Sequence, residues 1–151
     1  MAIEKTVIDS NVLLALIDKK DKWHTAASAL AKALMEAGWD VIYLDCVLNE
    51  VISVLGRRLE ERGELRSFVS LLDKLQKIVP EKTIEWLYPY VPEHYSKILH
   101  LIKENEGKLN FHDALIYFFM QEQRVDIIAS FDGDFDELTG IRRISSKNEV
   151  D

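Results

Sequence analysis

The sequence has little of several features that would assign it to a protein class at once. Its 151 residues include one cysteine, Cys46, so no internal disulfide framework is possible and a reducing compartment is the natural expectation. The three prolines and six glycines form no linker, and there is no internal repeat, so we expect residues 1–151 to form a single domain. Apolar runs such as residues 12–17 are far too short to cross a bilayer. The opening MAIEKTVIDS carries no recognisable secretion signal, and we expect a cytoplasmic protein that does not bind a membrane.

A surplus of basic residues is also missing. The chain has 26 acidic residues against 19 lysines and arginines, a net charge of −7, whereas surfaces that bind phosphates are usually basic. If five of the acidic residues share one metal site, the remaining 21 nearly balance the 19 basic ones. A divalent metal would offset part of the charge of that cluster. The acidic composition therefore permits a nucleic-acid partner without favouring one.

Short runs rich in β-branched residues alternate with longer segments of helical spacing. The runs predict strands and the longer segments predict amphipathic helices. Strands alternating with helices indicate an α/β protein, a three-layer sandwich whose central parallel sheet of four or five strands is flanked by helices. The expected strands are 5–8, 41–44, 83–87, 126–130 and 142–144, and the expected helices are 11–18, 22–37, 47–62, 68–78, 95–107 and 111–123.

Four acidic residues fall at one edge of the predicted sheet. Asp9 and Asp132 each follow a strand, and ligands of open parallel sheets bind beyond the carboxyl ends of the strands. Glu50 and Asp113 lie in the first turns of helices that begin near the same edge. Each acid alone also fits a turn or a favourable position in the helix dipole. The placement of all four acids at a single edge is more specific than the position of any one of them. We therefore expect their carboxylates to converge there.

A cluster of carboxylates predicts a hard metal ion. Like charges that lie close together repel, and a cation such as Mg²⁺ or Mn²⁺ relieves the repulsion through carboxylate ligands. Such an ion can activate water for attack on a phosphodiester. The sequence therefore predicts a metal-dependent nuclease. Asp9, Glu50, Asp113 and Asp132 are the candidate ligands of its metal ion, directly or through bound water.

Three polar residues are candidates for supporting this site. Ser10 and Asn11 flank Asp9 and could orient it or a ligand water by hydrogen bonds. Their other role is to cap the helix that follows, and the two roles are compatible. Ser130 lies at the end of the strand that precedes Asp132, and we expect it to support the same edge.

Three further residues are candidate RNA contacts. Arg57 and Arg58 lie two turns after Glu50, so they approximately share its helix face and could hold phosphates. An equally good interpretation is a solvated face paired with nearby glutamates. His112 could move a proton or contact a phosphate, although a partly exposed helix residue is the more frequent role of such a histidine.

The sequence resembles the PIN domains, especially the single-domain VapC toxins of VapBC toxin–antitoxin pairs. The matching segments, in order, are VIDSNVLLALI, LNEVISVL, FHDALI and IIASFDGDF. The resemblance implies that Asp9, Glu50, Asp113 and Asp132 are the catalytic acids, with Asp134 a further acid near the metal, that the cofactor is Mg²⁺ or Mn²⁺, and that the substrate is RNA. Among these acids we expect Asp9 and Asp113 to bind the metal directly, and Glu50 and Asp132 to act through water or a second ion. It also implies a Rossmann-like sheet, a homodimer and a VapB-like antitoxin. Ser10 stands where the family more often has threonine, which keeps the hydroxyl.

Two other functions remain open. The first is a PIN domain that binds RNA or a protein without cutting, although decayed sites usually lose acids. The second is a phosphotransferase of the haloacid-dehalogenase type, whose chemistry needs an aspartate two residues after the first one. Asn11 occupies that position, and no GxxxxGK phosphate loop is present. The phosphotransferase is therefore the weakest of the three hypotheses.

Overall fold

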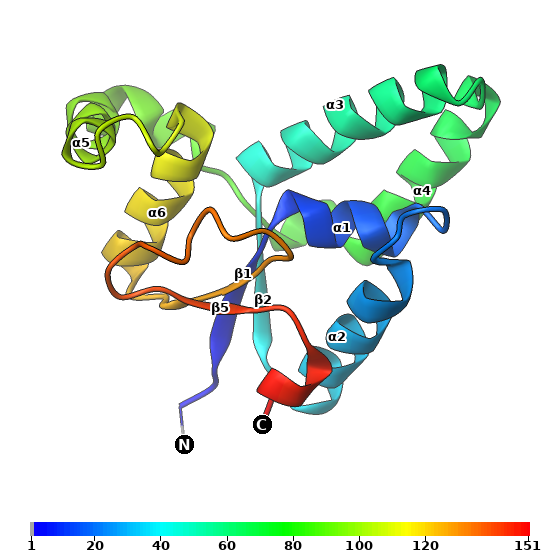
Figure 1. Cartoon of the computed structure of the whole chain (residues 1–151), viewed down its shortest axis with the longest axis horizontal. Helices are drawn as coiled ribbons and strands as arrows, with labels where there is room; N and C mark the ends of the chain where they lie inside the picture. Colours follow the sequence, from blue (N-terminus) through cyan, green and yellow to red (C-terminus); the bar gives the residue numbers. More distant parts are fainter. Residues whose placement is uncertain (1) are drawn as a thin grey trace.

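The computed structural model describes residues 2–151 and contains one five-stranded sheet (Figure 1). All neighbouring strands are parallel, and their order across the sheet is β3-β2-β1-β4-β5. This confirms the predicted α/β class and gives the larger of the two strand numbers expected. The strands are β1 (Lys5–Ile8), β2 (Asp40–Leu44), β3 (Ile84–Glu85), β4 (Ile127–Ala129) and β5 (Arg142–Ile144).

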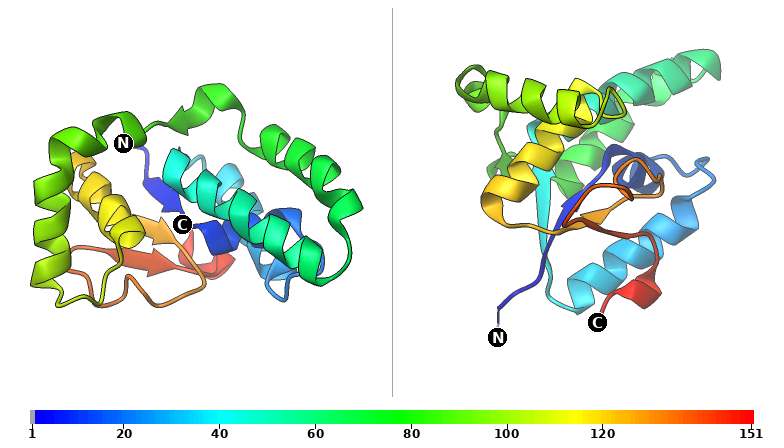
Figure 2. Two further views of the ribbon diagram at one scale, coloured as in Figure 1. Left: turned by 90° about the horizontal axis from the view of Figure 1, so that it is seen from above. Right: turned by 60° about the vertical axis from the view of Figure 1, so that its left-hand side comes forward.

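Helices cover both faces of the sheet. One group, α1 to α4, packs together on one side, and α5 and α6 pack against each other on the other side (Figures 1 and 2). Within residues 2–151 no helix is long and apolar enough to cross a membrane. The helices are α1 (Ser10–Ile17), α2 (His24–Glu36), α3 (Asp45–Glu61), α4 (Phe68–Ile78), α5 (Val91–Glu104) and α6 (Phe111–Gln123).

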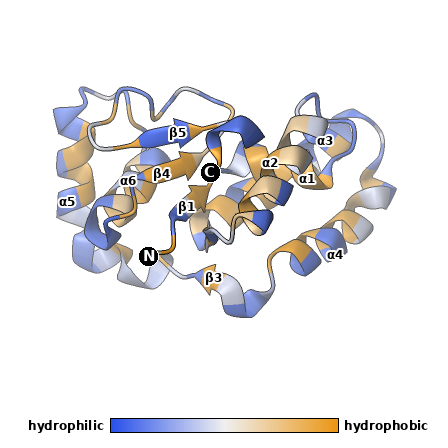
Figure 3. Cartoon of the chain, turned by 90° about the horizontal axis from the view of Figure 1, so that it is seen from below, coloured by the Kyte–Doolittle hydropathy of each residue, from blue (hydrophilic) through white to orange (hydrophobic). Residues whose placement is uncertain are grey.

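The core lies along the central strands and α1. Residues Thr6 to Ile8 of β1 and all of β4 are buried, as expected for strands covered on both faces. In α1, six of eight residues are buried, so this helix is apolar around most of its circumference and is packed inside the molecule. Figure 3 shows the same distribution, with hydrophobic colouring concentrated on β1, β4 and α1.

Three boundaries differ from the predicted ones for physical reasons. Helix α3 begins at Asp45, directly after β2, so no loop separates the strand from the helix. Helix α5 begins at Val91 because Pro92 lies in its first turn, where a missing N–H costs nothing. Strand β3 is only two residues long, and Pro89 lies in the turn that follows it.

Candidate metal centre

The register of the two central strands brings Asp9 and Ser130 together. Ile8 of β1 pairs with Ala129 of β4, so the next residue of each strand leaves the sheet at the same point. Ser130 Oγ donates a hydrogen bond of 2.7 Å to Asp9 Oδ2, although the two residues are 121 positions apart. The other carboxylate oxygen, Oδ1, accepts from the backbone N–H of Ser10 at 2.8 Å and caps helix α1. Both oxygens of Asp9 are therefore held in place.

Asn11 joins the two loops that leave these strands. Its Nδ2 donates to Ser130 Oγ at 3.1 Å, and its Oδ1 accepts from the backbone N–H of Phe131 at 3.0 Å. The N–H of Asp132 donates to the same Ser130 hydroxyl at 3.2 Å. The predicted supporting residues Asn11 and Ser130 are thus bonded to the residues they were expected to orient. The loop that carries Asp132 is fixed relative to Asp9 by this network.

Glu50 and His112 connect α3 to α6 across the carboxyl edge of the sheet. His112 Nε2 lies 2.9 Å from Glu50 Oε2, the distance of an ion pair when the imidazole is protonated. This nitrogen has no well-aligned hydrogen-bond partner, so the contact is mainly electrostatic. Burial opposes protonation of His112, but Glu50, Asp113 and Asp9 together outweigh it and its pKa is raised. His112 lowers the pKa of Glu50 in return, with a smaller contribution from Ser10.

Asp113 is placed by the cap of α6. Asn110 Oδ1 accepts from the backbone N–H of Asp113 at 2.8 Å, so the aspartate occupies the first turn as predicted. Burial is the main reason that its pKa rises to about 6; His112 counteracts part of this rise, while Asp134, Asp9 and Asp132 add to it. The carboxylate thus faces other carboxylates in a half-buried position.

Asp132 and Asp134 share the exposed loop after β4. The N–H of Asp134 donates to Asp132 Oδ1 at 2.8 Å, which closes a tight turn around Gly133. Partial burial raises the pKa of Asp134, and so does the charge of Asp132. Burial also raises the pKa of Asp9, against the lowering effect of Ser130 and Ser10, and the charges of Asp132 and Glu50 raise it further.

The charges of the five acidic residues therefore act on one another at this edge of the sheet. They do not form a ready-made cage: within residues 2–151 no three carboxylate, imidazole or thiolate groups are arranged to hold a metal ion. Ser130 and His112 instead occupy oxygens of Asp9 and Glu50. For three of these groups to bind one ion directly, side chains other than that of Asp9, which Ser130 and Ser10 hold, would have to rotate.

The donor chemistry of the site fits a hard divalent cation. All five acids offer carboxylate oxygens, which Mg²⁺ and Mn²⁺ prefer. The pKa of Asp9, Asp113 and Asp134 is raised partly by neighbouring acids, and a cation would relieve that repulsion. Cys46 is buried, and its thiol pKa is raised to about 12, chiefly by burial, so it is no candidate for a soft metal ligand.

The two arginines proposed as RNA contacts are placed differently from each other. Arg58 Nη1 lies 2.7 Å from Asp21 Oδ2 and 3.6 Å from Asp18 Oδ2, so its guanidinium is committed to an ion-pair network at the far end of α3. Arg57 is exposed and makes no ion pair with any other residue of the described chain. Arg57 remains a candidate contact, whereas Arg58 would first have to leave its partners.

Sequence reasoning missed Asp45, a buried aspartate at the same sheet edge. It directly follows β2, as Asp9 follows β1, so the same signal was present. Its Oδ1 accepts from the N–H of Cys46, and its Oδ2 accepts from the N–H groups of Leu87 and Tyr88 at 2.9 Å each. Through these three bonds Asp45 anchors the segment after β3 to the start of α3.

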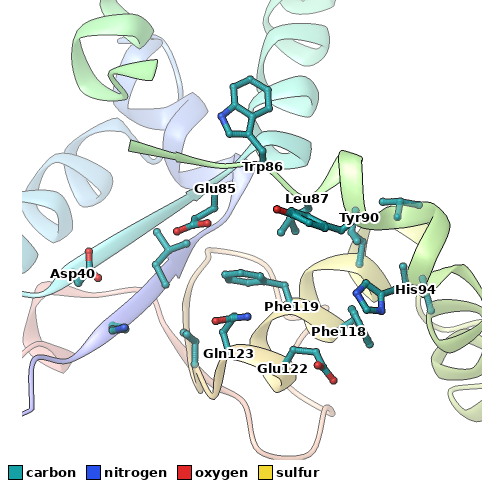
Figure 4. A pocket seen from close by; sticks show the side chains of 16 residues that line it. Asp40, Glu85, Trp86, Leu87, Tyr90, His94, Phe118, Phe119, Glu122 and Gln123 are labelled. Carbon is teal, nitrogen blue, oxygen red and sulfur yellow. The ribbon is translucent and has the colours of Figure 1, made fainter. Parts of the chain in front are cut away.

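A cavity of about 440 Å³ lies away from the acidic cluster. It is located between β2–β3 and α5–α6, and its walls include Trp86, Tyr90, Phe118 and Phe119 (Figure 4). None of the five acidic site residues lines it. The cavity is therefore separate from the chemistry of the cluster.

A family model described as the PIN domain matches residues 6–141, and the chain belongs to this family. The crystal structure of VapC20 from Mycobacterium tuberculosis, a toxin that cleaves the sarcin–ricin loop, is similar in fold. The TM-score is 0.64 at 22% sequence identity, and the match covers 89% of this chain and 95% of that one. Among curated proteins, no match was found.

Proposed function

We propose that this single PIN domain is a divalent-metal-dependent endoribonuclease that hydrolyses RNA phosphodiester bonds. The observation that carries the proposal is the convergence of five carboxylates from four separate chain segments at the carboxyl edge of the sheet. A structural role requires no such convergence, because gathering like charges destabilises the fold unless a cation is bound. Family membership and the fold shared with VapC20 support the same activity.

Asp9 and Asp113 are the proposed direct ligands of a Mg²⁺ or Mn²⁺ ion. Glu50, Asp132 and Asp134 would complete the site through water or a second ion. Such an ion, when bound, lowers the pKa of water and stabilises the charge that develops on a phosphodiester under attack. Ser130 and Asn11 hold Asp9 in its orientation, so the ligand pays little entropy on binding.

His112 has a proposed role as a mobile positive charge. In contact with Glu50 its raised pKa favours the protonated form, which offsets one carboxylate of the cluster. A cation bound in the cluster would offset the same negative charge and lower the pKa of His112 again, which would free the imidazole and its proton from Glu50. It can then contact an RNA phosphate or donate a proton near the site.

The biological setting we infer is that of a VapC-like toxin or a solitary RNA-processing nuclease in the cytoplasm. A toxin would have a VapB-like antitoxin and would form a homodimer, as the resemblance to VapC toxins implies. Candidate contacts for the RNA are Arg57 and His112, with Arg58 only after its ion pairs open.

The test is cleavage of a mixed RNA panel by wild-type protein and Asp9→Asn, each with Mg²⁺, with Mn²⁺ and with EDTA. Asp40→Asn is the matched control, because Asp40 is an exposed aspartate that starts β2 at the opposite edge of the sheet. We expect metal-dependent cutting by the wild type and by Asp40→Asn, and none by Asp9→Asn. Water-mediated hydrolysis should leave 5′-phosphate ends. Cyclic-phosphate ends, or cutting that EDTA does not stop, would contradict the mechanism.

A non-catalytic PIN domain that binds RNA or a protein is the second candidate. The observation that favours it is the lack of a ready metal cage within residues 2–151. It predicts that folded protein, free of partners, cuts no RNA under any metal condition. Retention of the four acids favours the enzyme over this alternative.

A further inference from the structure

An exposed tryptophan is stacked beside the acidic cluster. The rings of Trp23 and Phe131 are 4.9 Å apart between centroids and only 10° from parallel. Trp23 keeps 41% of its surface exposed, whereas a tryptophan that only fills the core is largely buried. The N–H of Trp23 donates to Asp21 Oδ1 at 2.8 Å, and Asp21 is in turn paired with Arg58. The bonded N–H is that of the backbone, so this contact fixes the chain at Trp23, and the indole rests on Phe131 while much of it remains in contact with solvent.

The stacked pair is continuous with the proposed site. Phe131 lies between Ser130, which bonds Asp9, and Asp132, and its N–H donates to Asn11. In Figures 1 and 2 the segment after β4 lies beside α1 and close to the segment that joins α1 to α2, which carries Trp23. An RNA strand whose phosphate reaches the acids would pass this pair with a neighbouring nucleotide.

A lysine accompanies the indole. Lys22 Nζ lies over the Trp23 ring, 5.5 Å from its centroid, and the exposed lysine would move aside when a base stacks on that face. A flat aromatic surface with an adjacent ammonium matches a nucleotide, since the base stacks on the ring while the ammonium meets the phosphate. In a chain of net charge −7, attraction to phosphates alone is weak. Contacts to bases must then carry a larger share of the affinity.

We propose that Trp23, supported by Phe131 and accompanied by Lys22, is a stacking platform for an unpaired base next to the nucleotide that is cut. The proposal rests on the proposed nuclease function for its location, but its binding test does not require cleavage. Such a platform selects single-stranded or looped RNA over a continuous duplex, because a base stacked on the indole has to leave the RNA helix.

The test is binding of two single-stranded RNA oligomers of about eight nucleotides to the full chain in EDTA. One oligomer carries bases and the other is abasic, with the same sugars and phosphates. Fluorescence anisotropy of an end label gives the affinity of each. We expect the wild-type protein to prefer the oligomer with bases by between about fivefold and a hundredfold, the range measured for one stacked base.

Variants separate stacking from packing. Trp23→Leu keeps an apolar side chain on Phe131 but removes the aromatic face, so its preference for bases should disappear, whereas Trp23→Phe should retain most of it. Lys22→Gln should keep the preference but reduce the salt dependence of binding by about one phosphate contact. Met35→Ala, a truncation at an exposed residue of α2, is the control and should bind like the wild type. Thermal melting verifies that each variant is folded.

Equal affinity of the wild type for both oligomers would overturn the proposal. A folded Trp23→Leu protein that keeps the full preference for bases would overturn it as well. A Trp23→Leu protein that differs from the wild type only in its molar mass by light scattering would also overturn it, because Trp23 would then belong to an interface between copies of the chain. The nuclease proposal is judged separately. Wild-type protein that prefers bases in EDTA but never cuts with metal would refute the nuclease and leave the platform intact.

Discussion

Replacing Ser130 by alanine removes one hydroxyl from the most densely bonded part of the acidic cluster. Ser130 is completely buried, and its Oγ donates to Asp9 at 2.7 Å while it accepts from Asn11 and from the N–H of Asp132. A hydrogen bond to a charged group contributes about 1.5–3 kcal/mol, and the two donors that lose their acceptor add to the loss. Because Asn11 and Asp132 lie partly in solvent, water can replace Oγ for them. We therefore expect the unfolding free energy to fall by about 2–3 kcal/mol.

Urea unfolding of metal-free Ser130→Ala measures this loss. Ser28→Ala is the matched control, because that hydroxyl bonds only to a carbonyl of its own exposed helix, and its loss should cost less than about 0.5 kcal/mol. Since the Ser130 hydroxyl lowers the pKa of Asp9, the variant should also titrate Asp9 at a higher pH, which carboxyl NMR can follow. Manganese affinity should weaken by about 10–100-fold, as for other residues that orient a metal ligand. Equal stability of the two serine variants would refute this account of Asp9.

Three further variants test other parts of the structure. Burial raises the pKa of Asp18, but Arg62, the backbone N–H of Lys20 and Arg58 together outweigh it, and the net pKa is lowered. Asp18→Asn should therefore lose about 2–4 kcal/mol of unfolding free energy at pH 7. This loss should shrink below about pH 4, as the wild-type carboxylate is protonated. The pKa of Asp113 is raised to about 6, so its ionisation destabilises the metal-free fold. Asp113→Asn should therefore raise the unfolding free energy by roughly 1 kcal/mol at pH 8 and give no gain below about pH 4. Chemical unfolding in EDTA measures both values. Asp45→Ala should lose about 2–3 kcal/mol of unfolding free energy, because three backbone N–H groups lose their acceptor. Limited proteolysis should then cut the segment after β3 faster than in the wild type.

The sequence predicted most of the fold because local signals agreed with the final packing. The bounds of β1 and α6 came out as expected, since β1 is a short run rich in β-branched residues and α6 has a clear N-cap at Asn110. The bounds of β5, with sequence RRI, also came out as expected. The weaker predictions lay where local signals were ambiguous. Strand β3 is held by only two pairs with β2, and the start of α5 depended on whether Pro92 ends a turn or opens a helix.

The placement of the acidic residues on the fold was predictable at the level of elements, but their contacts were not. Counting strands placed Asp9 and Asp132 at one edge, and the register of β1 with β4 does bring Ser130 to Asp9. The stack of Trp23 on Phe131 and the use of Asp45 as an anchor depend on segments far apart in the sequence, for which no periodicity exists. The same is true of the ion pairs that occupy Arg58.

Manganese binding to purified, RNA-free protein tests the central claim most directly, namely that the acidic cluster holds a divalent cation. Isothermal titration would compare the wild type with Asp9→Asn, Asp113→Asn and the distant control Asp40→Asn. We predict saturable binding by the wild type and by Asp40→Asn, and a loss of at least tenfold in affinity for the two site variants. Binding of equal strength by all four folded proteins, or by none of them, would contradict the assignment of these acids to a metal centre.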